Sequence, residues 1–301
     1  MDCIDLSSSN GSSISVNNIT GNSYGIYFNS SSSTNISGNS IIDNNYGLSG
    51  HSSFGSSISK NNIEASYKAG IELWYSSGCN ISGNHVAHNW LAMGIYYSSS
   101  SNISENNVIA NNNGGITVGH FFNGSICRNS VANNSPSGIM LGASSSNAIS
   151  GNNITGSGYQ GIGLVSGSAN NSIFGNNVMN NTKGILYSYS LNNVIYHNNF
   201  VDNAQQVYSE GSTNLWDDGY PSGGNYWSDY TGVDLYSGPF QNLTGADGIG
   251  DTPYTIDVNN ADQYPLTSNY VIPEFPSFFI LPLFMMTALL TVIFIRKRYE
   301  H

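Results

Sequence analysis

The chain has 301 residues, only 8% of them charged, and a formal net charge of −11 at pH 7. Its 7 Lys and Arg residues argue against a nucleic-acid partner, because phosphate binding requires a basic surface. A composition rich in Gly, Asn and Ser is often typical of disorder, but a fixed spacing of apolar residues favours a packed solenoid here.

The N-terminal residues, MDCIDLSSSNGSSISVNN, lead directly into a repeat without a basic region, an apolar region or a polar capping element. A solenoid end normally needs a cap, and an exported chain normally needs a signal peptide. We therefore expect the native chain to begin upstream of Met1.

Three apolar columns recur at intervals of 22 to 24 residues. The first comprises Ile14, Ile36, Ile58, Ile81, Ile103, Ile126, Ile149, Ile173 and Ile195. The second lies five residues further on and comprises Ile19, Ile41, Ile63, Val86, Val108, Val131, Ile154, Val178 and Phe200. The third follows a turn and, in every copy but the last, a Gly, and comprises Ile26, Leu48, Ile71, Ile95, Ile116, Ile139, Ile162, Ile185 and Val207. Such self-similarity indicates a repeat architecture.

The period and the residue types predict an all-β parallel β-helix of about nine rungs over residues 1–213. Each rung has room for three strands of about three to five residues, separated by the turn residues Asn, Gly and Ser. No segment before residue 275 has the apolar spacing of a long helix, and the Leu and Asn framework of leucine-rich repeats is missing.

One Asn column lies two residues before the second apolar column, without exception in nine copies. Its members are Asn17, Asn39, Asn61, Asn84, Asn106, Asn129, Asn152, Asn176 and Asn198. A buried carboxamide is costly unless its donors and acceptors are all used, and stacked Asn side chains satisfy one another. We predict an inward Asn ladder at a bend, with a structural role.

The outward positions beside the third column are where a binding site can lie. They are Tyr27, Ser49, Glu72, Tyr96, Thr117, Met140, Gly163, Leu186 and Tyr208. The third and fourth rungs are the richest, and the turn before the third column lengthens from 7 residues in the first copies to 9 between Val86 and Ile95. Exposed aromatic rings beside a carboxylate suit stacking of sugars, and the alternative is that they cover the flank. The candidate carbohydrate-binding residues are Glu72, Trp74, Tyr75, Trp90 and Tyr96.

Catalysis and disulfides find little support in the repeats. Glycoside hydrolysis needs two facing carboxyl groups, and a lyase needs clustered acids with a basic residue, but the carboxylates here do not cluster in rung register. Cys79 and Cys127 fall two rungs apart, roughly 10 Å, which is beyond disulfide reach. Together with Cys3 they are predicted to be unpaired.

The composition changes after Thr213. Residues 214–270 contain Trp216, Trp227 and eight Asp residues but no Lys or Arg, and we predict a cap module in which the aromatic residues cover the last rung. Asp247 and Asp251 in ADGIGDTPY resemble the end of an Asp-rich calcium loop, although the two earlier acids of such a loop are missing. Calcium is therefore a candidate ligand.

The tail NLWDDGYPSGGNYWSDYTG, followed by DGIGDTPYTID and DQYPL, resembles the C-terminal part of archaeal surface proteins with NosD-like repeats, a family described as periplasmic copper-binding. The resemblance covers nearly the whole chain and implies a right-handed β-helix of the carbohydrate-binding and sugar-hydrolase type. The copper description does not carry over to any residue, because the chain has no Met-rich or Cys/His cluster.

The segment 271–301 is predicted to anchor the chain. Residues 278–295 contain no charge and are just long enough to span a bilayer, and Arg296-Lys297-Arg298 belongs on the cytoplasmic side. The preceding Pro-Glu-Phe also resembles an archaeal sorting signal that an archaeosortase-like enzyme would cleave. Either reading places the β-helix outside the cell, where sequons such as Asn102 could be glycosylated.

The sequence thus predicts a cell-surface β-helix that binds carbohydrate or serves as an envelope component, with extracellular glycans or envelope components as partners. Two alternatives remain: a polysaccharide lyase, hydrolase or epimerase, and a structural spacer. Clustered outward carboxylates would favour the enzyme, an aromatic strip without them the binding protein, and neither feature the spacer.

Overall fold

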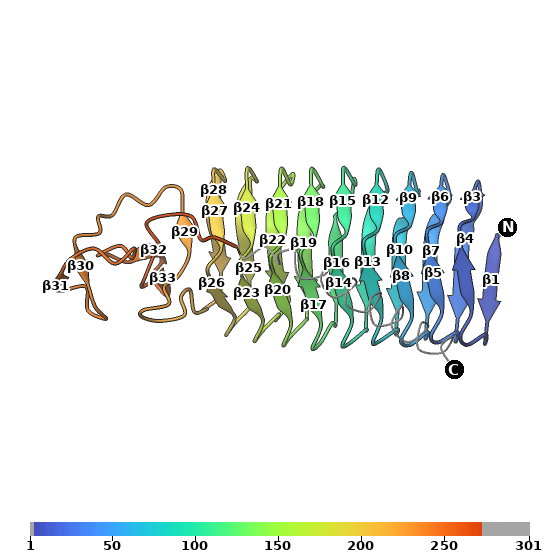
Figure 1. Cartoon of the computed structure of the whole chain (residues 1–301), viewed down its shortest axis with the longest axis horizontal. Coiled ribbons are helices and arrows are strands. Elements are labelled where there is room, and N and C mark those ends of the chain that lie inside the picture. Colours follow the sequence, from blue (N-terminus) through green and yellow to red (C-terminus); the bar gives the residue numbers. More distant parts are fainter. Residues whose placement is uncertain (1–2, 273–301) are drawn as a thin grey trace, which may run out of the picture. The chain divides into compact units, whose positions relative to one another are not determined.

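The computed structural model describes residues 3–272, and these form a right-handed parallel β-helix of about ten turns followed by irregular structure (Figure 1). The all-β prediction is confirmed, and no helix occurs among residues 3–272. Residues Met1–Tyr270 form one compact unit. The structure therefore does not separate the segment after Thr213 from the repeats.

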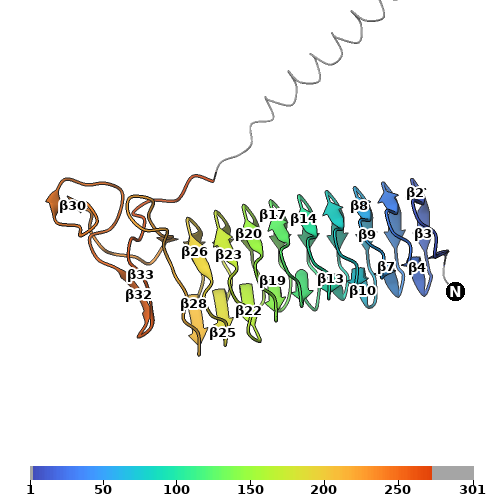
Figure 2. The ribbon, with the colours of Figure 1, turned by 90° about the horizontal axis from the view of Figure 1, so that it is seen from below.

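Three parallel sheets make up the coil, which we call sheets A, B and C (Figures 1 and 2). Sheet A consists of β1 (Ile4–Ser7), β4 (Tyr24–Asn29), β7 (Tyr46–His51), β10 (Ala69–Trp74), β13 (Leu91–Tyr96), β16 (Ile116–Gly119), β19 (Ser137–Gly142), β22 (Gln160–Val165), β25 (Lys183–Ser188) and β28 (Gln205–Glu210). Sheet B consists of β2 (Ser13–Ser15), β5 (Asn35–Ser37), β8 (Ser57–Ser59), β11 (Asn80–Ser82), β14 (Asn102–Ser104), β17 (Ser125–Cys127), β20 (Ala148–Ser150), β23 (Ser172–Phe174) and β26 (Val194–Tyr196). Sheet C consists of β3 (Asn18–Thr20), β6 (Ser40–Ile42), β9 (Asn62–Glu64), β12 (His85–Ala87), β15 (Asn107–Ile109), β18 (Ser130–Ala132), β21 (Asn153–Thr155), β24 (Asn177–Met179), β27 (Asn199–Val201) and β29 (Tyr226–Trp227).

The first and second apolar columns form the buried centres of sheets B and C, with Ile81 aligned to Ile103 and Val86 to Val108. Most strands of sheet A have six residues, longer than the predicted limit of five, because they hold two inward positions each. In β10 these are Ile71 and Leu73, both fully buried.

The third column was misassigned in one rung. Ile71 aligns with Met93 and not with Ile95, and Met93 aligns in turn with Ile116. The pattern Gly94-Ile95 imitated the Gly-Ile pair of the other copies, whereas the structure uses Ala92-Met93 at that place. The turn after Val86 is therefore not lengthened to 9 residues, and the outward residue next to the third column is Gly94 rather than Tyr96.

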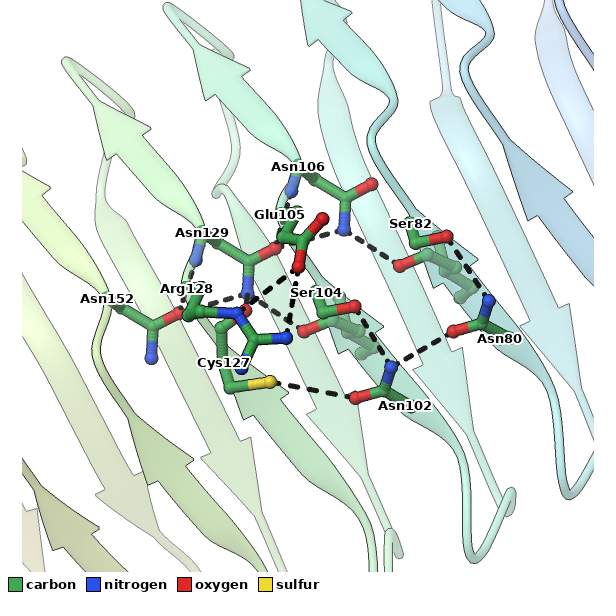
Figure 3. Close-up of polar contacts among 12 residues, drawn as sticks. Asn80, Ser82, Asn102, Ser104, Glu105, Asn106, Cys127, Arg128, Asn129 and Asn152 are labelled. Carbon is green, nitrogen blue, oxygen red and sulfur yellow. Dashed lines mark hydrogen bonds and ion pairs between the residues drawn. The ribbon is translucent and has the colours of Figure 1, made fainter. Parts of the chain in front are cut away.

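The predicted Asn column forms a hydrogen-bonded ladder at the bend between sheets B and C, and Figure 3 shows three of its members. Asn129 is typical: its Nδ2 donates to Asn152 Oδ1 at 2.9 Å and to Ile103 O at 2.9 Å, and its Oδ1 accepts from the backbone and side chain of Asn106. The buried members thus use both donors and the acceptor away from water, as a buried carboxamide requires, whereas Asn17 at the start of the ladder is exposed.

A second ladder, which the sequence analysis missed, runs along the bend between sheets C and A. Its members are Asn22, Asn44, Asn89, Asn111, Asn134, Asn181 and Asn203. Ser66 and Ser157 interrupt it, and both hydroxyls are buried without a hydrogen-bond partner. The signal was present in the sequence, because an Asn recurs five residues after most members of the first ladder.

The Gly before the third column leaves room for this ladder. A Cβ at Gly25 would lie 2.5 Å from the carbonyl oxygen of Gly47, and a Cβ at Gly184 would lie 2.6 Å from that of Gln206 and 3.0 Å from the amide of Asn203. A Cβ at such distances would force the next rung to shift, although the column does hold Ala92 and Gln206 in two rungs. The sequence pattern of Gly followed by Ile therefore reports close approach of successive rungs.

Aromatic side chains cover the last rung. Trp227 stacks on Phe200 with ring centroids 4.5 Å apart, Tyr254 stacks on Trp227 at 4.3 Å, and Trp216 meets Tyr187 edge-on. Both Trp residues are fully buried. Short strands complete this region: β30 (Tyr236–Ser237), β31 (Leu243–Thr244), β32 (Tyr254–Asp257) and β33 (Asn260–Asp262).

The same region also ends the first ladder. Asn198 Nδ2 donates to Asn225 Oδ1 at 2.9 Å, and the backbone N–H of Asn225 donates to Asp262 Oδ2 at 2.7 Å. Trp227 Nε1 donates to the same oxygen at 2.9 Å. Because the ladder points its donors towards the C-terminus, its last member needs an acceptor, and a carboxylate supplies one. Burial raises the pKa of Asp262 to about 7, against the effect of these hydrogen bonds.

No helix that could cross a membrane is found among residues 3–272. The predicted span 278–295 and the sorting signal at Pro273-Glu274-Phe275 lie outside the described residues.

Candidate functional site

The outer face of sheet A carries a group of aromatic side chains over its N-terminal strands. The side chains that point outward from strands β4, β7, β10 and β13 include Tyr27, His51, Glu72, Trp74 and Tyr96. All five are half-buried, so each still presents surface to solvent. Nothing in the repeat itself requires an aromatic residue at an outward position.

These rings contact one another. Trp74 and Tyr96 have ring centroids 4.5 Å apart, and at the next corner Tyr75 stacks on Tyr97 at 5.0 Å and Tyr97 on His120 at 4.5 Å. At the start of the strands, Tyr24 stacks on Tyr46 at 4.9 Å and meets Tyr27 at 5.2 Å. We call this set the aromatic face; its members are Tyr24, Tyr27, Tyr46, His51, Glu72, Trp74, Tyr75, Tyr96, Tyr97 and His120.

Glu72 is the one carboxylate in β4, β7, β10, β13 and β16. Burial raises the pKa of Tyr46 and that of Tyr96, and the negative charge of Glu72 raises both further. Both phenols therefore remain protonated at neutral pH and keep their O–H donors. Glu72 adds an acceptor, so the centre of the aromatic face offers donors and an acceptor between rings.

Gly94 allows Tyr96 to lie across the sheet. Gly94 aligns with Glu72 in the neighbouring strand, and a Cβ there would lie 2.8 Å from the Tyr96 ring and 3.0 Å from its hydroxyl. The ring of Tyr96 therefore occupies the space over Gly94, next to Glu72.

The structure brings together four of the five predicted carbohydrate-binding residues and separates the fifth. Trp90 precedes β13, whereas Tyr96 ends it, and a six-residue strand spans about 20 Å. Trp90 instead lines a depression with Tyr67 and His88 at the corner between sheets C and A. Closeness in the sequence suggested one site because both residues belong to the same rung.

Six members of the aromatic face were not among the candidate residues chosen from the sequence: Tyr24, Tyr27, Tyr46, His51, Tyr97 and His120. Tyr24 and Tyr46 occupy equivalent places in successive repeats, and His120 lies 23 residues after Tyr97. Comparing residues one repeat apart, rather than neighbours in the chain, would have found them.

The two candidate calcium ligands hold backbone N–H groups. Asp251 Oδ2 and Oδ1 accept from Leu235 N and Tyr236 N, each at 3.0 Å, and Asp247 Oδ1 accepts from Ile249 N at 3.1 Å. Asp234 in turn accepts from Asp247 N and Gly248 N. These hydrogen bonds show that the three Asp side chains hold the loops in place. Calcium binding by Asp247 and Asp251 stays a prediction.

The family model of the periplasmic copper-binding protein NosD matches residues 51–232, which is more than half of the chain. The chain belongs to the NosD family. No curated protein sequence matches it significantly. The family assignment agrees with the resemblance found in the tail, and it describes a group of proteins located in the periplasm.

Solved structures similar to this NosD-family chain share its fold. The Dettilon tailspike protein has a TM-score of 0.55 and 13% identity, covering 72% of this chain and 57% of its own. The enzymatically active domain of tailspike protein 2 from bacteriophage CBA120 has a TM-score of 0.54 and 13% identity, covering 78% of this chain and 44% of its own. A periplasmic alginate epimerase has a TM-score of 0.44 and 20% identity, covering 71% of this chain and 72% of its own. The chain thus spans little more than half the length of the first tailspike.

The copper in the family description does not fit the described residues. Copper sites are built from His, Cys and Met side chains, but within residues 3–272 no group of three or more His, Cys, Asp or Glu side chains could hold a metal ion. His85 lies 3.9 Å from Glu64 and 3.1 Å from Asn107, and His88 belongs to a different corner. Cys3, Cys79 and Cys127 are unpaired, as predicted.

Proposed function

We propose that this protein binds carbohydrate through the aromatic face of sheet A. The observation that carries the proposal is two groups of contacting, solvent-accessible rings, one containing Tyr46 and the other Tyr96, both of which feel the charge of Glu72. Sugar rings have apolar C–H faces that pack on aromatic rings and hydroxyls that bond to carboxylates and phenols. An aromatic strip favours a binding protein over a structural spacer.

The arrangement of carboxylates favours binding over hydrolysis. A glycosidase uses two carboxyl groups on either side of the scissile bond, at a separation of about 5 to 9.5 Å. Glu72 has no second Asp or Glu in the strands of sheet A that form the aromatic face. A lyase, hydrolase or epimerase remains the alternative that a product assay can distinguish.

We further propose that the protein acts outside the cytoplasmic membrane and is held at the cell surface by residues 278–295, with glycans or envelope components as partners. The family description as periplasmic and the charge-free segment before Arg296-Lys297-Arg298 support this. In intact cells, an external protease should remove the β-helix; full protection of the chain would contradict surface exposure.

The binding proposal is tested with the full chain and a panel of neutral and uronate polysaccharides, following both retention of polymer and the masses of any products. We expect retention without new products, and retention about tenfold weaker for Trp74→Ala, since losing a stacked ring costs about 1.4 kcal/mol. Tyr196→Ala is the matched control, because Tyr196 stacks on Phe174 on the outside of sheet B.

New oligosaccharides or unsaturated ends would overturn the binding-only account and favour the enzyme. Equal loss of retention in Trp74→Ala and Tyr196→Ala would remove the aromatic face as the site.

A further inference from the structure

The corner between sheets C and A carries two exposed aromatic residues that the repeat does not explain. Backbone hydrogen bonds fix the register here: Tyr67 N donates to Asn44 O at 3.0 Å, and Trp90 N donates to Ser66 O at 2.9 Å. The equivalent residues of other rungs are Asn45, Asn112, Ser135, Gly158 and Ala204. All five of these residues are small or polar. At the same place Tyr67 and Trp90 are aromatic, and they are 71% and 52% exposed.

These two residues border a hollow surface. One depression of about 280 Å³ is lined by Asp43, Tyr67, His88, Trp90 and neighbours, and an adjacent one of about 400 Å³ is lined by Asp43, Tyr67, Asn22 and Asn45. Asp43 and Tyr67 belong to both, so the two depressions lie next to each other. We call them together the corner groove.

The rings of the corner groove differ from those of the aromatic face. On the aromatic face, Trp74 contacts Tyr96 and Tyr75 contacts Tyr97, so each ring covers part of its neighbour. Among residues 3–272, no ring contact joins Tyr67 or Trp90 to another aromatic ring. Their faces are available to a ligand, and a stacked sugar needs a ring face rather than an edge.

The charge of the corner groove selects among sugars. Asp43 lines both depressions, and neither is lined by Lys or Arg. A carboxylate accepts hydrogen bonds from sugar hydroxyls but repels another carboxylate. The amides of Asn45 and Asn112 add donors and acceptors, and Asn22, whose Nδ2 already donates to Thr20 O and Asn44 Oδ1, adds the acceptor Oδ1. A neutral sugar fits this surface, and a uronate does not.

We propose that the corner groove is a second carbohydrate site, selective for neutral sugar residues, in which Trp90 and Tyr67 stack on the sugar and Asp43 binds its hydroxyls. The proposal rests on the carbohydrate function inferred above but concerns a different place. Trp90 and Tyr96 lie at opposite ends of β13, about 20 Å apart along the strand.

Trp90 can be observed separately from the aromatic face. The chain has four Trp residues; Trp216 and Trp227 are fully buried, so in a full-chain Trp74→Phe variant Trp90 is the exposed Trp. Quenching of its fluorescence by acrylamide is then measured with neutral gluco-, manno- and galacto-oligosaccharides and with galacturonate oligosaccharides of equal length. We expect neutral oligosaccharides to reduce quenching at least twofold and galacturonate to leave it unchanged.

Asp43→Asn in the same background is expected to admit galacturonate, so that protection of Trp90 appears with both kinds of sugar. Tyr67→Ala should weaken neutral binding about tenfold, since one of the two stacking surfaces is lost. Both positions are exposed, so neither variant should affect folding.

The outcomes separate the two proposals. Polymer retained by the wild-type chain with unchanged quenching of Trp90 for every sugar would overturn the corner groove and leave the aromatic face. Protection by galacturonate equal to that by neutral sugars in the unmodified groove would overturn the selectivity assigned to Asp43. No retention of any sugar would remove both sites.

Discussion

In the N-terminal rungs the outer faces of sheets A and B differ in chemistry, although they belong to the same rungs. In β4, β7, β10 and β13 sheet A exposes Tyr, His, Glu and Trp, whereas the outward residues of β5, β8, β11 and β14 in sheet B are only Asn and Ser. Figure 3 shows the sheet B surface, where Asn102 bonds to Asn80, and the adjoining bend towards sheet C, where Arg128 pairs with Glu105 at 3.0 Å.

Both faces lie over the same core of Ile and Val and the same ladders of Asn. The interior therefore does not account for the difference, and the outward residues of sheet A are free to serve a ligand. On sheet B, Asn102 bonds to Asn80 of the preceding rung and to Ser104 of its own strand, and such polar contacts are sufficient for a solvated sheet. We therefore expect substitutions in the interior to change the free energy of unfolding and substitutions on the aromatic face to change binding.

The largest loss of stability is expected for a substitution in the first Asn ladder. Asn129→Ala removes hydrogen bonds to Asn106, Asn152 and the carbonyl of Ile103, and leaves their buried partners unsatisfied. We expect a loss of about 3 kcal/mol in the free energy of unfolding, measured by denaturant titration. Asn102→Ala on the outside of sheet B is the control and should cost less than about 1 kcal/mol. Equal losses in both variants would contradict the division between interior and surface.

The end of the ladder should respond to pH. Asp262→Asn keeps one accepting oxygen but turns an NH₂ group towards the N–H of Tyr264, at a cost of about 2 kcal/mol. In the wild-type chain the folded pKa of Asp262, about 7, lies above the unfolded value of 3.8, so folding binds a proton between these values. Its contribution to stability is therefore largest at acid pH and falls as pH rises from about 4 to about 7.

We expect the stability difference between wild type and Asp262→Asn to shrink from pH 4.5 to pH 7.5 in parallel denaturant titrations. Asn102→Ala, which removes no ionisable group, should show no such trend. A difference that grows with pH would contradict the raised pKa of Asp262.

A smaller effect is expected on the aromatic face. Gly94→Ala places a methyl group against the ring of Tyr96, which must move off the sheet beside Glu72. Affinity for the retained polysaccharide should fall roughly fivefold, about 1 kcal/mol, with little change in stability. Gly163→Ala is the matched control, because it occupies the same column and would meet the ends of the Met140 and Gln160 side chains rather than an aromatic ring. Unchanged affinity in Gly94→Ala would exclude Tyr96 from the site.

The smallest effect is a gain. Ser66 interrupts the second ladder, and its buried hydroxyl has no hydrogen-bond partner. Ser66→Asn should restore the bonds to Asn44 and Asn89 and raise the free energy of unfolding by about 1 kcal/mol, measured by denaturant titration. The space exists, because Gly47 stands opposite Ser66 as Gly70 stands opposite Asn89. A destabilised variant would show that the two ladders are not equivalent.

The sequence was sufficient for the parts of the fold in which one residue type repeats. The columns of Ile81 and Val86 and the ladder through Asn106 were recognised because their chemistry is the same in every rung. The sequence pattern was misleading at Met93, because the Gly94-Ile95 pair, which begins two residues after Ala92-Met93, resembles the Gly-Ile pair of the other rungs. Register in one rung depends on contacts with the next, which a linear pattern does not contain.

The candidate site was predicted in composition but not in arrangement. Glu72, Trp74, Tyr75 and Tyr96 do share a surface, since they follow one another across adjacent strands. Trp90 does not, because a strand as long as β13 carries the chain to the opposite edge of sheet A. Tyr46 was missed because its contribution depends on Tyr24 in the preceding rung and on the charge of Glu72 in the following one.

The most direct test is a crystal structure of the full chain with a neutral oligosaccharide that the protein retains. The account predicts sugar density on the outer side of sheet A, stacked on the rings of Trp74 and Tyr96 and bonded to Glu72. Density on the Asn and Ser face of sheet B, with the aromatic face empty, would contradict it.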